Sequence, residues 1–183
     1  MASIPVGQRQ KTRHVTQGEV CIADADATCV TTILGSCIAT LIWDPEAKVG
    51  GLNHLLLPDA RPQNAAAMAP DVNLMELLIN GVLSAGGARK RFRAKIFGGA
   101  QMIDGLGSTG AANVQFVERF LADEGIPCLA RSTGGRHARR LRVWPAQGRV
   151  QQKRVANFDP TIDAPDPRRL RKQALKLSGV ELL

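Results

Sequence analysis

Residues 31–58 read TTILGSCIATLIWDPEAKVGGLNHLLLP, and three β-rich runs follow one another within them. The runs 31–34 and 38–43 are separated by the small residues Gly35-Ser36-Cys37, which predict a tight turn. The segment DPEAK carries a proline where a turn favours it, and the run 49–57 follows. The stretch therefore predicts a strand, a small-residue turn, and a strand–turn–strand unit.

Two helices are expected further along the chain. One begins at Asp71, has apolar residues at helical spacing, and stops at Gly86-Gly87; the other covers residues 111–124 and ends before Gly125. Further strands are expected over residues 19–23, 92–97, 126–131, 139–144 and 149–155. Because the strands and helices do not form regular βαβ units, we expect an α+β fold, a layered α/β sandwich with mixed β-sheets and two main helices.

Length and composition indicate one ordinary globular domain. The chain has 183 residues, of which 44% are hydrophobic, and this excludes disorder throughout. No apolar run approaches the roughly 20 residues that cross a bilayer, and no apolar core follows the first basic residues as in a secretory signal. We expect a cytoplasmic protein with a flexible N-terminus (1–16), a folded domain (17–156) and a Pro/Asp linker with a basic C-terminal tail (157–183).

Charge is distributed unevenly along the chain, whose formal net charge is +8. Residues 1–130 hold 11 Lys/Arg against 12 Asp/Glu, whereas residues 131–183 hold 13 against 4. Such asymmetry suggests an acidic partner, with a solvated tail as the alternative. A nucleic-acid-binding domain ranks low, because the basic third has only Trp144 and Phe158 for base stacking.

The sequence predicts neither a metal site nor an organic cofactor. The three histidines are far apart and no C-x-x-C pair occurs, so a structural zinc site is disfavoured. The string Gly105-x-Gly107-x-x-Gly110 fits a dinucleotide fingerprint, but the preceding expected strand ends at Phe97, and we interpret the string as a flexible loop. The cysteines are expected to be free thiols, three of them packing residues; the four are Cys21, Cys29, Cys37 and Cys128.

Cys37 and His54 are the candidate nucleophile and general base. A hairpin centred near residues 45–46 places the two side chains opposite each other, where Cβ atoms come within about 4.5–5.5 Å. An imidazole at that distance draws a thiol toward the thiolate, which attacks carbonyl groups. Backbone N–H groups of the turn at Gly35 and Ser36 can bind an oxyanion. The alternative is a buried cysteine beside a core histidine.

Several linked motifs resemble those of the CheD family of chemoreceptor glutamine deamidases, in the family's order from about Glu19 to Lys153. The motifs are Thr31-x-x-Leu34-Gly35-Ser36-Cys37-x-Ala39, Asp44-Pro45, Gly50-Gly51-Leu52-x-His54-x-x-Leu57-Pro58, Ala94-Lys95-Ile96-Phe97-Gly98-Gly99-Ala100-x-Met102, Gly110-x-x-Asn113-Val114, Gly125-Ile126-Pro127, and Gly134-Gly135 with Arg139.

The resemblance implies a cysteine-hydrolase fold related to toxin deamidases, and an enzyme that converts glutamines of methyl-accepting chemotaxis receptors to glutamate. It makes Cys37 the nucleophile, His54 the base, and Thr31 the residue that holds the histidine. The alternative for Thr31 is an ordinary β-branched strand residue. Reported action on receptor methyl esters needs the same acyl chemistry. No metal or cofactor is implied.

The resemblance also implies partners. Substrate or partner docking is expected around Phe97, Gly98, Gly99 and Ile103. Ile103 replaces an aromatic residue common in the family near the docking site of the phosphatase CheC, which argues against a CheC partner. We expect the basic tail to raise the rate of encounter with the receptors' cytoplasmic helices by electrostatic steering. The alternative function is a non-catalytic chemotaxis adaptor that binds receptors or a phosphatase.

Overall fold

A computed structural model describes residues 11–23, 28–56, 69–101, 109–156, 158 and 168. The strands are β1 (Lys11–His14), β2 (Val20–Ala23), β3 (Thr28–Leu34), β4 (Ile38–Asp44), β5 (Val49–Leu55), β6 (Arg93–Gly98), β7 (Cys128–Thr133), β8 (Ala138–Trp144) and β9 (Arg149–Val155). The α-helices are α1 (Ala69–Ser84) and α2 (Thr109–Asp123), and the short 3₁₀ helices are η2 (Arg89–Arg91) and η3 (Pro145–Gln147).

The strands form two mixed sheets. One has five strands in the order β2-β5-β4-β6-β7, and the other has four in the order β1-β3-β8-β9. Only the β1–β3 and β6–β7 pairs are parallel among these strands. The expected α+β class is confirmed. Because β3 and β4 belong to different sheets, the chain passes from one sheet to the other at Gly35–Cys37.

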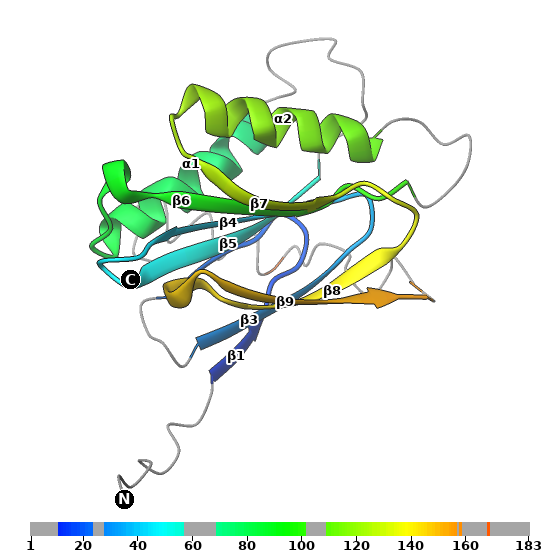
Figure 1. Cartoon of the computed structure of the whole chain (residues 1–183), viewed down its shortest axis with the longest axis horizontal. Helices are drawn as coiled ribbons and strands as arrows, with labels where there is room; N and C mark the ends of the chain where they lie inside the picture. Colours follow the sequence, from blue (N-terminus) through cyan, green and yellow to red (C-terminus); the bar gives the residue numbers. More distant parts are fainter. Residues whose placement is uncertain are drawn as a thin grey trace, which may run out of the picture.

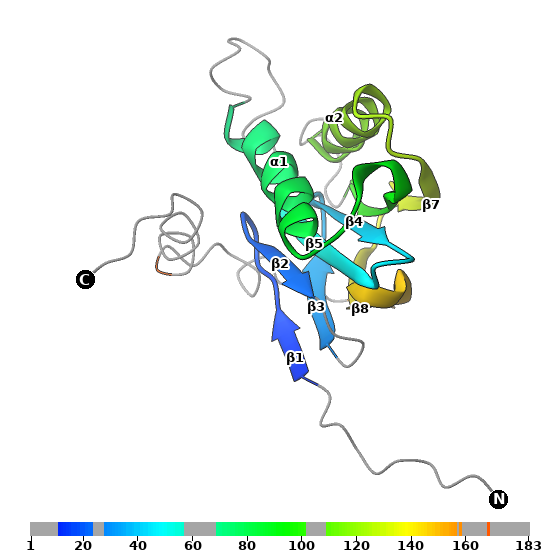
Figure 2. The same cartoon turned by 90° about the vertical axis from the view of Figure 1, so that its left-hand side faces the viewer.

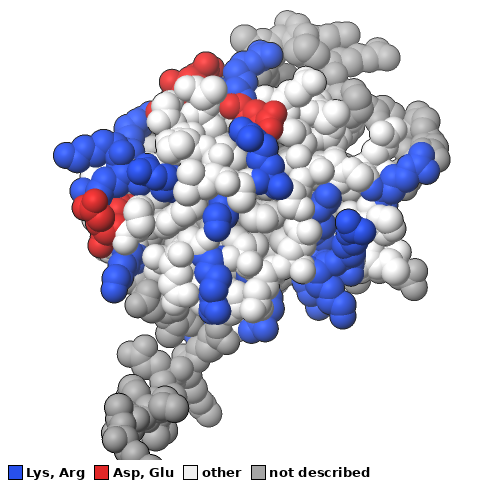
Figure 3. Space-filling model, viewed as in Figure 1, with Lys and Arg blue, Asp and Glu red and all other residues white. Residues whose placement is uncertain are grey.

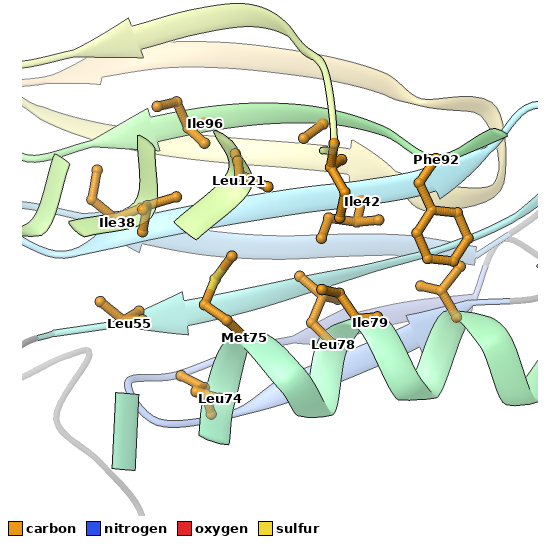
Figure 4. Close-up of a cluster of buried hydrophobic side chains, with 14 of the residues drawn as sticks. Ile38, Ile42, Leu55, Leu74, Met75, Leu78, Ile79, Phe92, Ile96 and Leu121 are labelled. Carbon is orange, nitrogen blue, oxygen red and sulfur yellow. The ribbon is translucent and has the colours of Figure 1, made fainter. Parts of the chain in front are cut away.

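The molecule is layered, with both helices on one face of the five-stranded sheet and the four-stranded sheet on the other (Figures 1 and 2). Alternate side chains of β4 point to the two sides. Ile38 and Ile42 join the cluster under the helices, which Figure 4 shows with Met75 and Leu78 of α1. Leu41 belongs to the cluster between the sheets. Because both faces of β4 are covered, all of its residues are buried.

The N-terminal expectation needs correction. Lys11–His14, placed within a flexible segment, instead pairs in parallel with Thr28–Thr31 as β1. All four β1 residues are exposed, so no apolar alternation marks the strand in the sequence. Residues 1–10 and nearly all of the expected linker and tail lie outside the described residues.

The end of β4 away from the Gly35–Cys37 turn is fixed by a buried carboxylate. Asp44 has no exposed surface, and Arg91 of η2 donates to both of its oxygens at 3.0 Å. Backbone amides of Glu46, Ala47 and Ala88 also donate to it, at 2.9, 3.1 and 2.8 Å. Burial on its own raises the pKa of Asp44, but these hydrogen bonds hold that pKa well below its usual range.

We predict that Asp44→Ala lowers the free energy of unfolding by about 3–5 kcal/mol, because it leaves the partly buried Arg91 without its carboxylate. The matched control is Glu46→Gln, which removes an exposed carboxylate that also contacts Arg91, at 3.3 Å, and which we expect to cost about 1 kcal/mol or less. Urea denaturation at pH 7 measures both.

The same carboxylate predicts an acid-sensitive part of the stability. A carboxyl whose folded pKa is depressed stabilises the fold above its unfolded pKa, about 3.9, and loses that contribution as the pH falls further. The Asp44→Ala variant therefore loses less stability than the wild type between about pH 4 and pH 2. Parallel acid-induced losses in the two proteins would contradict the assignment.

Candidate active site

The Gly35–Cys37 turn is held by hydrogen bonds from the far end of β6 and from α2. The amide of Ala100 donates to the Gly35 carbonyl at 2.9 Å, and the amide of Gly99 donates to the Cys37 carbonyl at 2.8 Å. The Asn113 side chain, buried in α2, donates to the Ser36 carbonyl at 2.8 Å. The three successive carbonyls of the turn thus all accept hydrogen bonds, two from the backbone after β6 and one from α2.

The close approach at this turn requires glycine at residue 98. Gly98 has φ +113°, and a Cβ atom there would lie 2.1 Å from the Cys37 carbonyl oxygen. Gly99 and Gly110 are similarly crowded, since a Cβ on Gly110 would lie 2.6 Å from the Gly99 oxygen. The glycines of the motifs therefore bring β6 and the first turn of α2 directly against the turn that carries Cys37.

Arg139 of β8 stabilises the backbone that packs against the Cys37 turn. Its guanidinium is buried and donates to the carbonyls of Gly98, at 3.4 Å, and Gly134, at 2.5 Å. Burial, together with the nearby Arg154, lowers the pKa of Arg139. The glycine pair and arginine of the motif Gly134-Gly135…Arg139 thus support the backbone that contacts Cys37.

The fixed carbonyls determine where the turn's amides point. No peptide bond between described residues is cis, and in a trans peptide the C=O and the following N–H point in opposite directions. Since the Gly35 and Ser36 carbonyls point toward Ala100 and Asn113, the amides of Ser36 and Cys37 point away from them. Adjacent backbone amides whose orientation is fixed in this way can bind an oxyanion.

His54 of β5 is fully buried, and its ring is fixed by Thr32 of β3. The Thr32 hydroxyl oxygen lies 2.9 Å from His54 Nδ1, and the same hydroxyl donates to the Val15 carbonyl at 2.8 Å. A hydroxyl has one hydrogen to donate, so toward His54 it accepts, and Nδ1 carries the proton. Nε2 is then the basic nitrogen of the ring.

Backbone hydrogen bonds fix His54 as well. Its carbonyl accepts from the Gly18 amide at 2.8 Å, and its amide donates to the Glu19 carbonyl at 3.0 Å. The Glu19 carboxylate in turn accepts from the Thr16 amide at 2.7 Å. Residues 15–19, which precede β2, therefore form part of the structure that positions the histidine.

Cys37 and His54 are near neighbours on one sheet face, although the expected register is wrong. His54 lies opposite Ala39, and Ile38 lies opposite Leu55, so Cys37 stands diagonally from His54 instead of directly across from it. A two-residue difference keeps both side chains on the face that meets the four-stranded sheet. Cys37 is partly exposed there, within reach of a substrate, whereas His54 is buried.

The expectation for Thr31 is wrong by one residue. Its hydroxyl lies 3.1 Å from Nδ1 of His14, on the opposite face of β3 from Thr32. Successive side chains of a strand point to opposite faces, so only one of two adjacent threonines can reach His54. Thr32 and the Val15 carbonyl were both missed. No sequence signal singles out Thr32, because its parity with Leu34 becomes informative only once the structure shows that Leu34 points between the sheets.

The residues expected to dock a substrate or partner occupy different places. Phe97 is only 6% exposed and packs between the sheets, so it is a core residue. Gly98 and Gly99 form the backbone support of the Cys37 turn. Ile103 lies outside the described residues.

A cleft of about 490 Å³ opens beside this support. Its walls are Gly99, Gln101, the first half of α2 around Val114, and the turn between β7 and β8 around Gly135. Gly99 lines this cleft and also supports the Cys37 turn, because its amide donates to the Cys37 carbonyl.

The other cysteines suit packing better than chemistry. Burial raises the pKa of the Cys21 and Cys128 thiols, which disfavours their thiolate forms, and Cys29 is fully buried. All four cysteines are free thiols. In the described ranges, no three His, Cys, Asp or Glu side chains gather where they would hold a metal ion, and no helix is long and apolar enough to span a membrane.

Comparisons with known proteins identify the family. The family described as "CheD chemotactic sensory transduction" matches residues 56–154. A Caulobacter protein (strain K31) named "Probable chemoreceptor glutamine deamidase CheD" is 49% identical over 158 residues, 84% of each chain. One of the same name from Cereibacter sphaeroides (strain ATCC 17029 / ATH 2.4.9) is 53% identical over 147 residues, 80% of this chain and 73% of that one.

The chain belongs to the CheD family. Among solved structures, Neisseria meningitidis protein NMB0706, of family DUF152, is similar with a TM-score of 0.44 and 11% identity. That match covers 68% of this chain and 64% of the other.

We predict that Thr32→Val lowers the free energy of unfolding by about 1–3 kcal/mol, because it leaves the buried Nδ1–H of His54 without its acceptor. Thr31→Val, one residue away and on the partly exposed face, should cost less than about 1 kcal/mol. Urea denaturation measures the difference, and ¹⁵N chemical shifts of the His54 ring report its tautomer. Equal costs, or a proton on Nε2 in the wild type, would overturn this assignment.

Proposed function

We propose that this protein is a chemoreceptor glutamine deamidase that acts in the cytoplasm through a Cys37 thiolate and a His54 base. The observation that carries the proposal is the hydrogen-bond chain from Val15 through Thr32 to His54. It makes Nε2 the basic nitrogen of a buried histidine on the same sheet face as the partly exposed Cys37 thiol. The names of the close relatives supply the substrate, a glutamine of a chemotaxis receptor.

The first half of the reaction forms a thioester. Nε2 of His54 accepts the Cys37 proton, and the thiolate attacks the carbonyl carbon of the glutamine side chain. The protonated ring then gives this proton to the departing nitrogen, so ammonia leaves as the carbon–nitrogen bond breaks. The Thr32 oxygen accepts from Nδ1–H throughout and stabilises the imidazolium that forms.

Negative charge on the tetrahedral intermediate needs donors that are already in place. The amides of Ser36 and Cys37 are the candidates, because their orientation is fixed by the carbonyls bonded to Ala100 and Asn113. Removing one such donor from an oxyanion site typically costs about 10²–10³-fold in kcat. Gly98 and Asn113 act here as positioning residues.

The second half releases glutamate. His54 takes a proton from water, the hydroxide attacks the thioester, and the Cys37 sulfur leaves and recovers a proton from the ring. The net change is one water consumed and one ammonia released. The same two groups would cleave a receptor methyl ester, with methanol in place of ammonia.

We predict that Cys37→Ala abolishes deamidation of a purified receptor cytoplasmic fragment, with little loss of stability, because the side chain is partly exposed. Mass spectrometry detects each deamidation as an increase of about 1 Da at a glutamine, the difference between an amide and an acid. Cys128→Ala, which removes the other partly exposed thiol, is the matched control and should keep its activity. A wild-type protein that binds the fragment without changing its mass would instead be an adaptor.

His54→Ala should lower kcat by at least the ~10²–10⁴-fold that general acid–base catalysis supplies. It should also slow alkylation of Cys37 by iodoacetamide near neutral pH, because the thiol loses the base that favours its thiolate. His14→Ala, which removes the histidine bonded to Thr31, is the control for both measurements. Equal alkylation rates in the wild type and the His54 variant would disprove the pairing.

A further inference from the structure

The four-stranded sheet is unusually basic. Its strands contain eight Lys/Arg residues and no Asp or Glu. The five-stranded sheet contains three Lys/Arg and one Asp, the buried Asp44. In Figure 3, Lys and Arg side chains gather over the part of the molecule where Figure 1 shows β8 and β9, and the acidic side chains lie elsewhere.

Strand alternation gathers four of these cations on the side of β8 and β9 that faces away from the five-stranded sheet. Arg140 and Arg142 are exposed, whereas Leu141 and Val143 between and beside them are buried in the inter-sheet cluster. Lys153 lies opposite Arg140, and Arg149 lies opposite Trp144. We call the surface formed by Arg140, Arg142, Arg149 and Lys153 the basic face.

An aromatic ring orders part of the basic face. The guanidinium carbon of Arg149 lies 3.7 Å from the centre of the Trp144 ring, and that of Arg142 lies 5.3 Å from it. Cation–π contacts of this kind hold the side chains in place without neutralising their charge. The face therefore presents positive charge from a rigid sheet.

The charge count also corrects the expectation for the tail. Residues 128–156 carry eight Lys/Arg and no Asp or Glu, whereas residues 157–183 carry five Lys/Arg and four Asp/Glu. Nearly all of the net positive charge of the C-terminal third thus belongs to β7–β9 and their turns. An electrostatic effect on partners should originate there.

The basic face is close to the active site. Arg140 pairs with Ile33, near the end of β3, and Cys37 is four positions further along the chain. Four steps of chain span at most about 14 Å. The thiol faces the space between the sheets and is partly exposed there, so a helical partner seated on the basic face reaches it by extending past the end of β3.

We propose that the basic face docks an acidic helical surface of the receptor substrate, an inference that rests on the proposed function. Each deamidation replaces a neutral amide by a carboxylate and so adds one negative charge to that surface. The face therefore binds the product form of a receptor more tightly than the glutamine form. Complementary charge of this kind raises the encounter rate and is screened by salt.

The test compares a basic-face variant, R140Q/R142Q/K153Q, with a control variant, K48Q/K90Q/R119Q, which removes the same charge from exposed cations elsewhere. At about 20 mM salt, the basic-face variant should lower kcat/KM on a receptor cytoplasmic fragment about tenfold or more and leave kcat unchanged. The loss should shrink above about 0.3 M salt, and the control should show little of it. R140Q/K153Q, which touches no aromatic ring, should give a smaller loss of the same kind.

One further substrate and one truncated variant complete the comparison. A short neutral peptide with one glutamine should react equally well with the wild type and the basic-face variant, because it has no acidic surface to dock. Truncation after Ala156 should change kcat/KM on the receptor fragment much less than the basic-face variant does. Equal losses in the basic-face and control variants would overturn the proposal.

Binding measured with Cys37→Ala separates docking from catalysis. This variant should bind a glutamate form of the receptor fragment more tightly than the glutamine form, and neutralising the basic face should remove the difference. If the wild type never deamidates while this binding pattern holds, the proposed function fails and the docking surface stands. Tighter binding of a random DNA duplex than of the receptor fragment, lost in the basic-face variant, would instead make the surface a polyphosphate site and overturn the proposal.

Discussion

The hydrogen bonds to the carbonyls of the Gly35–Cys37 turn are the constraint on which the site depends. They join the crossing between the two sheets to the end of β6 and to α2, and Asn113 reaches Ser36 across 77 positions of sequence. Gly98 permits the contact, because any side chain there would collide with the Cys37 carbonyl. A turn held in this way keeps the thiol and the two amides in one arrangement without a ligand.

The two sheets contribute differently to the site. The five-stranded sheet carries His54 and leads out of the Cys37 turn, and the four-stranded sheet supplies the Thr32 hydroxyl that sets the tautomer. The cluster between the sheets helps to bury the imidazole, and burial strengthens its hydrogen bond to Thr32. The proposed catalytic pair thus depends on how the sheets pack. The exposed cations of β8 and β9 lie on the opposite side of the four-stranded sheet, which faces away from the five-stranded sheet.

Local sequence patterns predict most of the fold. The errors concern strand pairing, side-chain direction and register, which depend on residues that are distant in sequence. β4 and both helices follow from apolar spacing and glycine stops, and β9 has the bounds expected from the sequence. The sequence does not predict β1, because KTRH has no apolar face. Only its pairing with β3 in the folded molecule makes it a strand. The resemblance indicates Thr31 instead of Thr32, and apolar alternation does not correct it, because nearly every residue of β3 is buried. The hairpin register depended on the turn's centre, which composition alone does not fix.

The distance in sequence between Cys37 and the residues that support its turn has a consequence for synthesis. Thr32 and His54 are only 22 positions apart and emerge early from the ribosome with Cys37, whereas Gly98 and Asn113 follow much later. Until Gly99, Ala100 and Asn113 have been made, the hydrogen bonds that orient the carbonyls of the turn cannot all form. The order of synthesis therefore delays the completed turn until more than half of the chain has been made.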